Sequence, residues 1–288
     1  MEAEIQKCLD ELLESNYLSE DDYKLLNPVG TRPGIMYGLC KVHKDKSNGF
    51  ILPPFRPILS TIRTCAYNMA KIFVPLLKEH TMNEYTVKDS FSFANEIVEQ
   101  NADLYMVSFD IQSLFTNIPL DETIDICVER VYNKLKKVKG LLKRHFKSLL
   151  AFVTKSSCFV FNGKFYSQID GVAMGSPLGP TLANLFLCYH ELKWLEHCPV
   201  QFKPVFFRRY VDDIFLLFDN REKVKKFWRY LNSKHKNIKF TYEEEEEIAL
   251  RNKINNDVFS VFFEIQGTLY AKEAKRSPVI IKDHRLAF

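Results

Sequence analysis

Two adjacent acids interrupt a long, largely apolar stretch in the second half of the chain. Asp212 and Asp213 stand between the segments Val205–Val211 and Ile214–Phe218. Two apolar segments separated by a short polar step are typical of strand, tight turn and strand. Adjacent carboxylates at the tip of a buried hairpin repel each other, and desolvation further disfavours their charged forms. A bound divalent cation usually offsets this electrostatic cost.

A second strand-like segment supplies a further acid. Residues 104–109 are almost entirely apolar and are followed directly by Asp110. If this strand lies beside the hairpin, Asp110 and Asp212 face each other and hold two Mg²⁺ ions about 4 Å apart, an arrangement that stabilises attacking and leaving oxygens in phosphoryl transfer. The pattern therefore predicts nucleotidyl transfer. The alternative is an ordinary turn, because Asp favours β-turns for local hydrogen-bonding reasons.

The composition is that of a globular, mildly basic chain. It has 288 residues, 46% of them hydrophobic, and a formal net charge of +4. Basic residues gather within 41–46, 134–144 and 223–229, which suits a phosphate backbone, although solvated helix faces give the same pattern.

Cysteines and the N-terminal sequence bear on the cellular compartment. The seven cysteines are scattered and include no Cys-x-x-Cys pair, so we expect reduced core residues of an intracellular protein and no zinc site. We see no signal peptide and no run as long as a membrane span.

The order of the expected elements predicts an α+β fold, in which the acid-bearing segments share one antiparallel sheet backed by helices. Asn162–Gly163 between aromatic and branched residues predicts a hairpin. Ser19 with Asp22 resembles a capping pair at the start of a short helix. Further helices are expected over residues 3–14 and 65–80, after Pro119, and from Ser176, Pro177 or Pro180 onward, with irregular strands and loops over 27–57.

Several segments, taken in their order along the chain, resemble a reverse transcriptase, and more closely the Penelope-like retroelement branch. Together they cover roughly residues 20–242, and their joint occurrence is far more specific than any one motif. The segments are Tyr37–Lys44, Arg56–Ile58, Phe109–Pro119, Gly171–Pro180 with Asn184 and Glu191, and Arg209–Phe215.

The resemblance implies a right-hand polymerase with fingers and a palm. We expect an N-terminal helical remnant over 1–26, fingers over 27–103 and a palm with the metal site over 104–242. A fingers insertion is expected at about 140–168. Residues 243–288 are expected to be a degenerate primer-grip and thumb remnant, in which Phe262–Ile265 weakly resembles the primer-grip motif.

Carried over by position, the resemblance assigns the metal site. Asp110 and Asp212 would ligate both Mg²⁺ ions, for which Mn²⁺ is a possible substitute. Asp213 would support the site, and the Ile111 carbonyl would complete one coordination sphere.

The resemblance also assigns residues to the incoming nucleotide. Lys41, Lys44 and Arg56 match finger positions near the triphosphate, and their types fit phosphate recognition. Phe115 matches the steric gate that leaves no room for a 2′-hydroxyl, the alternative being a core phenylalanine. Gln168 matches a position beside the nascent base pair.

A further group is assigned to the template and primer. It consists of Gly171, Met174 and Gly175, in a loop where glycine lets the backbone approach a base, and of Tyr210. The alternative for the loop is a plain helix-capping turn.

The resemblance implies an RNA-directed DNA polymerase of a retroelement. Its partners would be an RNA template, a DNA primer and deoxynucleoside triphosphates, in the nucleus and away from membranes, with the oligomeric state left open. Because little chain follows residue 242 for a thumb, we expect a catalytic fragment with weak processive synthesis. The alternative is a catalytically impaired, nucleic-acid-binding remnant of such an enzyme.

Overall fold

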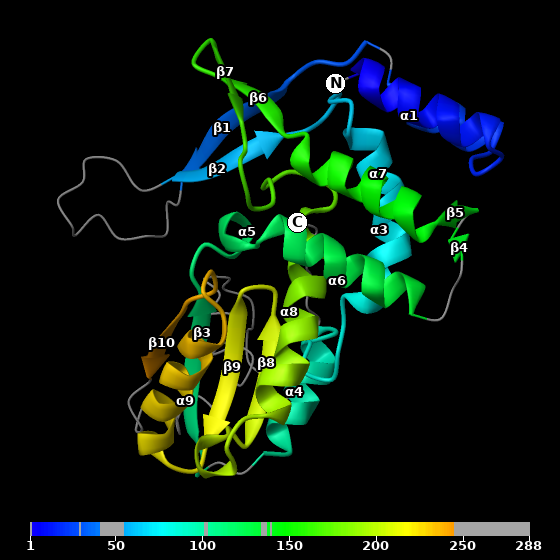
Figure 1. Cartoon of the computed structure of the whole chain (residues 1–288). Coiled ribbons are helices and arrows are strands. Elements are labelled where there is room, and N and C mark those ends of the chain that lie inside the picture. The colour runs from blue at the N-terminus through cyan, green and yellow to red at the C-terminus, as the bar shows by residue number, and fades with distance from the viewer. Residues whose placement is uncertain are drawn as a thin grey trace. The chain divides into compact units, whose positions relative to one another are not determined.

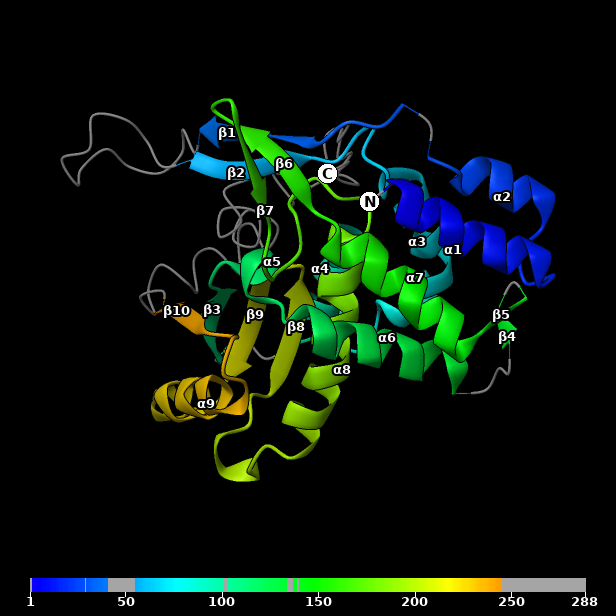
Figure 2. The ribbon, with the colours of Figure 1, turned by 45° about the horizontal axis from the view of Figure 1, so that its top comes forward.

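Two compact units make up the chain, and each is built from two separate stretches of sequence. The first unit combines Met1–Asn83 with Ser113–Leu192, and the second combines Glu84–Gln112 with Lys193–Phe288. Figures 1 and 2 show the elements of both units in two views. This computed structural model describes residues 2–28, 30–40, 55–100, 103–133, 137–138 and 140–244.

An antiparallel sheet forms the centre of the second unit. Within the described residues it has four strands in the order β10-β3-β9-β8. In this register Asp110 lies opposite Asp213 on one side and Thr241 on the other. The strands are β3 (Tyr105–Ile111), β8 (Phe206–Tyr210), β9 (Asp213–Phe218) and β10 (Phe240–Glu244).

Helices pack on both faces of this sheet because its strands alternate apolar residues between the two faces. On one face, Phe227 of α9 (Arg221–Lys234) contacts Phe109 and Phe218. On the other face, α4 (Ser90–Val98) adds its apolar residues to a cluster around Phe215. The short 3₁₀ helix η2 (Val200–Phe202) precedes β8.

The first unit contains a second sheet, with strand order β2-β1-β6-β7 in the described part of the chain. Its strands are antiparallel except for β1 and β6, which pair in parallel. The strands are β1 (Gly34–Cys40), β2 (Phe55–Ser60), β6 (Cys158–Phe161) and β7 (Lys164–Ser167).

Helices supply the rest of the first unit, in which the rings of Phe73, Tyr132 and Phe146 pack edge to face. These ring contacts join α3, α6 and α7 into one core. Figure 1 shows the three helices side by side. The helices are α1 (Glu2–Glu14), α2 (Glu20–Leu26), α3 (Tyr67–Leu77), η1 (Lys78–His80), α5 (Leu114–Asn117), α6 (Leu120–Tyr132) and α7 (Lys143–Lys155), with β4 (Lys137–Val138) and β5 (Leu141–Leu142) between α6 and α7. The long helix α8 (Gly179–Glu196) leads from this unit into the second.

Most expected elements are present, and the predicted α+β class is confirmed. Asn162 and Gly163 both have positive φ, as a two-residue β6–β7 turn requires. Ser19 caps α2 by accepting a hydrogen bond from the Asp22 amide. Helix α8 begins at Gly179, so Pro180 stands in its first turn, whereas Ser176 belongs to the preceding turn.

Four α-helices of the described residues, α4, α5, α7 and α9, were not predicted. Asp89 is the N-cap of α4, and its carboxylate accepts hydrogen bonds from two amides of the first turn. An Asp at this position is a capping signal that can be read from the sequence. Helix α7 begins within the basic cluster 134–144, so Lys143 and Arg144 lie at a helix start and are exposed.

The loop between β7 and α8 depends on two glycines that the protein backbone itself crowds. Gly171 has φ +77°, and a Cβ there would lie 2.5 Å from the Thr116 carbonyl oxygen. Gly175 has φ +116°, and a Cβ there would lie 2.4 Å from the Leu59 carbonyl oxygen. These glycines are therefore needed to pack the loop against α5 and β2.

We predict that Gly171→Ala lowers the free energy of unfolding by about 1–3 kcal/mol, because the new methyl group meets fixed backbone at a positive φ. Urea denaturation followed by circular dichroism measures the change. Gly163→Ala is the matched control, since Gly163 has φ +72° but open space around it. Equal losses in the two variants would contradict the proposed crowding.

Candidate active site

The β8–β9 hairpin has a two-residue turn that contains Asp212, whereas Asp213, predicted to share the tip, is the first residue of β9. Tyr210 pairs with Asp213, so Val211 and Asp212 form the turn. Val211 has φ +57°, a positive value at the first turn residue, as in a type II′ turn where glycine is usual. A β-branched residue in this conformation is strained by roughly 1–3 kcal/mol.

Strand β3 brings the third acid to the same end of the sheet. Asp110 is the direct partner of Asp213, and directly opposed residues point to the same face. The Ile111 amide donates a hydrogen bond of 3.0 Å to the Asp212 carbonyl, which fixes the turn beside β3. Asp110 lies within β3, which continues to Ile111, although the sequence placed it after the apolar run.

The three carboxylates repel one another. The pKa of Asp213 rises from 3.8 to about 7, first because burial disfavours its charge and then because Asp212 and Asp110 lie close to it. Asp110 is exposed, and Asp212 and Asp213 are half-buried, so ions in solvent have access to the group. Carboxylate oxygens are the ligands that hard divalent cations prefer, so the three acids are candidate ligands.

A second group of predicted residues comes together in the first unit. The Val172 amide donates to the Phe115 carbonyl at 2.7 Å, and the Leu59 amide donates to the Met174 carbonyl at 2.7 Å. The Thr61 hydroxyl donates to the Gly175 carbonyl at 3.1 Å. Phe115, the 171–175 loop and the end of β2 are therefore held as one structure.

The remaining predicted residues lie around this group or outside the described residues. Arg56 is exposed on β2, opposite Leu39 of β1. The Gln168 side chain donates to the Asp170 carbonyl at 3.0 Å, just before the loop. Lys41 and Lys44 lie outside the described residues, as does Phe262–Ile265.

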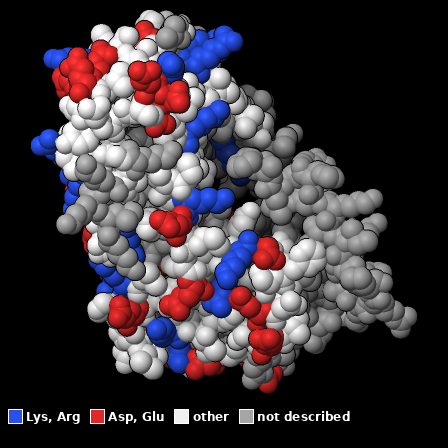
Figure 3. Space-filling model, turned by 90° about the vertical axis from the view of Figure 1, so that its right-hand side faces the viewer, with Lys and Arg blue, Asp and Glu red and all other residues white. Residues whose placement is uncertain are grey.

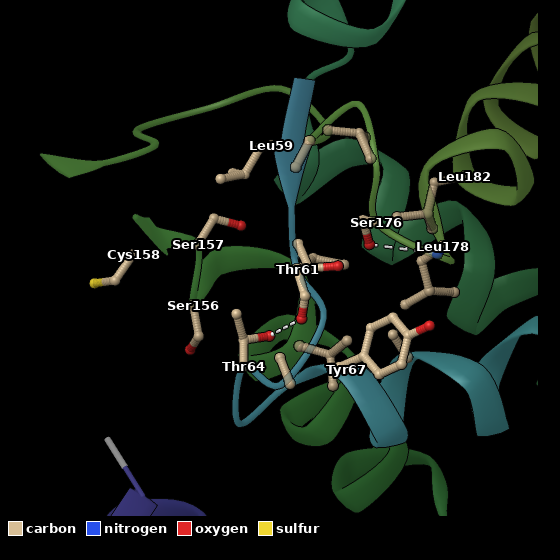
Figure 4. A pocket seen from close by; sticks show the side chains of 16 residues that line it. Leu59, Thr61, Thr64, Tyr67, Ser156, Ser157, Cys158, Ser176, Leu178 and Leu182 are labelled. Carbon is tan, nitrogen blue, oxygen red and sulfur yellow. Dashed lines mark hydrogen bonds between the residues drawn. The ribbon is translucent and has the colours of Figure 1, made fainter. Parts of the chain in front are cut away.

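A small pocket lies beneath the 171–178 loop (Figure 4). Its walls come from the end of β2, the start of α3, the start of β6 and the loop, and they include hydroxyls of Thr61, Thr64 and Ser176. Its volume of about 20 Å³ is room for roughly one water molecule. The pocket is thus part of the loop's packing and is too small to hold a nucleotide.

One face of the molecule shows mixed charge rather than a single basic stripe. On the face shown in Figure 3, Lys and Arg side chains are interspersed with Asp and Glu. The basic cluster at 223–229 lies on α9, whose buried residues Val224, Phe227 and Leu231 face inward. This cluster matches the alternative reading, a solvated face of an amphipathic helix.

We predict that the stability of the metal-free protein falls as pH rises from about 4 to about 7 and then levels off. In that window folded Asp213 keeps a proton that the unfolded chain, with a pKa of 3.8, has already lost. Thermal unfolding midpoints measured with a chelator across this range test the prediction. Asp213→Asn should flatten this part of the profile, and an unchanged slope would contradict it.

Comparison with known proteins identifies the family of the chain. The family profile described as "Reverse transcriptase (RNA-dependent DNA polymerase)" matches residues 43–245. No curated protein matches the chain. Among the described residues, no helix has both the length and the apolar character needed to cross a bilayer.

Solved structures of telomerase share the fold. The apo telomerase of Candida tropicalis has a TM-score of 0.54 and 14% identity, covering 83% of this chain and 49% of its own. The Candida albicans telomerase, in complex with the TWJ fragment of telomeric RNA, has a TM-score of 0.53 and 12% identity, covering 83% and 47%. The chain thus spans about half the length of these proteins. Because the family profile covers most of the chain and the fold agrees, the chain belongs to the reverse transcriptase family.

Proposed function

We propose that this chain carries the catalytic part of an RNA-directed DNA polymerase. One observation supports this above all. Asp110 and Asp213 lie opposite each other on adjacent strands, with Asp212 on the turn beside them. In a chain of the reverse transcriptase family, acids clustered in this way are suited to holding divalent cations for nucleotidyl transfer.

We infer that Asp110 and Asp212 hold Mg²⁺, with Mn²⁺ as a possible substitute, that Asp213 supports them, and that the Ile111 carbonyl completes one coordination sphere. Divalent cations, when bound, supply positive charge that stabilises the attacking and leaving oxygens. In the reaction the primer 3′-oxygen bonds to the α-phosphorus of the nucleotide, loses its proton, and pyrophosphate leaves.

The first unit supplies the candidate residues for substrate binding. Arg56 is exposed on β2 and suits triphosphate oxygens, which a guanidinium binds in a bidentate fork; Lys41 and Lys44 are proposed beside it. The 171–175 loop, with Gln168 before it, is proposed to line the template base and the nascent pair. Tyr210 of the second unit is proposed to contact the primer.

The finer identity rests on sequence motifs. We propose the Penelope-like branch of retroelements, an RNA template with a DNA primer, deoxynucleoside triphosphates and a nuclear location. The division into fingers over 27–103 and palm over 104–242, with remnants on either side, also remains a proposal. The telomerase likeness supports a shared fold and does not assign this chain a telomeric RNA.

We predict that Asp110→Asn or Asp212→Asn abolishes primer extension on an RNA template with Mg²⁺, while the affinity for the template–primer duplex stays nearly unchanged. Each change removes a carboxylate ligand but no phosphate contact. Single-nucleotide extension and fluorescence anisotropy measure the two properties.

Asp219→Asn is the matched control for these variants. Asp219 is an exposed acid just after the far end of β9, where it pairs with Lys223. Extension lost in Asp219→Asn as well would contradict the assignment. Duplex binding without any extension by the wild-type chain would favour the nucleic-acid-binding remnant.

We predict that Phe115→Ala raises the incorporation of ribonucleotides relative to deoxyribonucleotides. The half-buried ring is proposed to exclude a 2′-hydroxyl, and its removal would leave room for that group. The ratio of kcat/KM for the two nucleotides measures the effect. Phe165→Ala, which removes a ring that is 76% exposed, should leave the ratio unchanged. An unchanged ratio in Phe115→Ala would support the core-residue alternative.

A further inference from the structure

Arg209 is a fully buried cation beside the strained turn. It lies in β8, two residues before Val211, and its side chain has 0% exposure. Burying a guanidinium costs free energy unless its donors find acceptors. Arg209 Nη1 donates a hydrogen bond of 2.9 Å to the Val211 carbonyl, the residue with φ +57°.

The backbone of Arg209 is fixed from both sides. Across the sheet it pairs with Ile214 of β9. On its other side, the Arg209 amide donates to the Tyr85 carbonyl at 2.8 Å, and its carbonyl accepts from the Val87 amide at 2.9 Å. The guanidinium therefore projects from an immobile anchor.

The strand register places Arg209 on the opposite face of the sheet from Asp110 and Asp213. Asp213 is the partner of both Asp110 and Tyr210, so these residues share one face of the sheet. Arg209 is adjacent to Tyr210 along β8 and so points to the opposite face. The hydrogen bond to the Val211 carbonyl thus reaches the turn from the face opposite Asp110 and Asp213.

We propose that Arg209 is a positioning residue, which holds the strained Val211 turn from the back of the sheet so that Asp212 stays in place beside Asp110. A β-branched residue at a positive φ relaxes unless its surroundings restrain it. The inference rests on the proposed function, in which these acids hold a divalent cation. Partners that orient metal ligands typically contribute 10–100-fold to metal affinity.

The neighbouring Arg208 provides a matched control. It lies on the same strand but on the face of Asp213, and its Nε is 2.5 Å from a carboxylate oxygen of Glu96. If only the positive charge mattered, changes at Arg208 and Arg209 would affect cation binding in the same direction. Removing either positive charge would then strengthen cation binding, which is opposite in sign to the effect of losing a positioning contact.

The test is the affinity for Mn²⁺ of the full chain without nucleic acid, measured by electron paramagnetic resonance. Arg209→Gln, which is too short to reach Val211 and carries no charge, should weaken binding by about 10–100-fold. Arg208→Gln should not weaken it. A role confined to stability would lower the unfolding midpoint of Arg209→Gln without changing the Mn²⁺ affinity of the folded protein.

A double-mutant cycle tests whether Arg209 acts by restraining the strained backbone of Val211. In a Val211→Gly background the positive φ costs little, so adding Arg209→Gln should weaken Mn²⁺ binding by no more than about threefold. An undiminished loss in that background would overturn the proposal, because the arginine would then act by another route.

Arg209→Lys keeps the buried charge and is included in case Arg209→Gln does not fold. A flexible ammonium holds a carbonyl less firmly than a planar guanidinium, so we expect Mn²⁺ binding about three- to tenfold weaker than in wild type. If every folded Arg209 variant binds Mn²⁺ with unchanged affinity, the inference about Arg209 is wrong and the proposed metal site is unaffected. Wild type that binds no Mn²⁺, or binding that survives Asp110→Asn, overturns the proposed metal site and the inference with it.

Discussion

Mutual repulsion among three carboxylates is the constraint on which the candidate site depends. Asp110, Asp212 and Asp213 would separate if they were on flexible segments. They are instead held by the backbone pairing of β3 with β9 and by the hydrogen bond from the Ile111 amide to the Asp212 carbonyl. Burial, and then the nearby carboxylates of Asp212 and Asp110, raise the pKa of Asp213. A bound cation would lower this electrostatic cost, which is the physical basis of the proposed metal site.

The surrounding structure supplies the stability that offsets the repulsion among the three carboxylates. Phenylalanines on both faces of the sheet pack against α4 and α9, which gives the strands a buried, rigid support. The turn itself is strained at Val211, and its carbonyl is bonded to the buried Arg209. Apolar burial and backbone pairing thus stabilise a local arrangement that is unfavourable in isolation.

In the first unit, too, a locally unfavourable backbone conformation is held by its surroundings, and there it depends on glycine. Gly171 and Gly175 let the loop lie directly against the backbone of α5 and β2. The sequence suggested that these glycines allow close approach to a nucleic-acid base. The structure gives them a second reason, close approach to the protein, and this places Phe115, Met174 and the end of β2 in one group.

The sequence by itself determined the elements whose signals are local. The hairpin that carries Asp212, the Asn162–Gly163 turn and the Ser19 cap follow from residue type and spacing, because each depends on contacts within a few residues. The family motifs also identified Asp110 as a partner of the acid pair. Helix α4 was missed although its Asp89 cap is a local signal of the same kind.

Only the tertiary structure decided what depends on pairing between distant segments. The register that sets Asp110 opposite Asp213 joins strands about a hundred residues apart, and no local pattern specifies which residues face each other. The contacts of Arg208 and Arg209 differ for the same reason. Two adjacent arginines look alike in sequence, but alternation along β8 sends one to Glu96 and buries the other behind the turn.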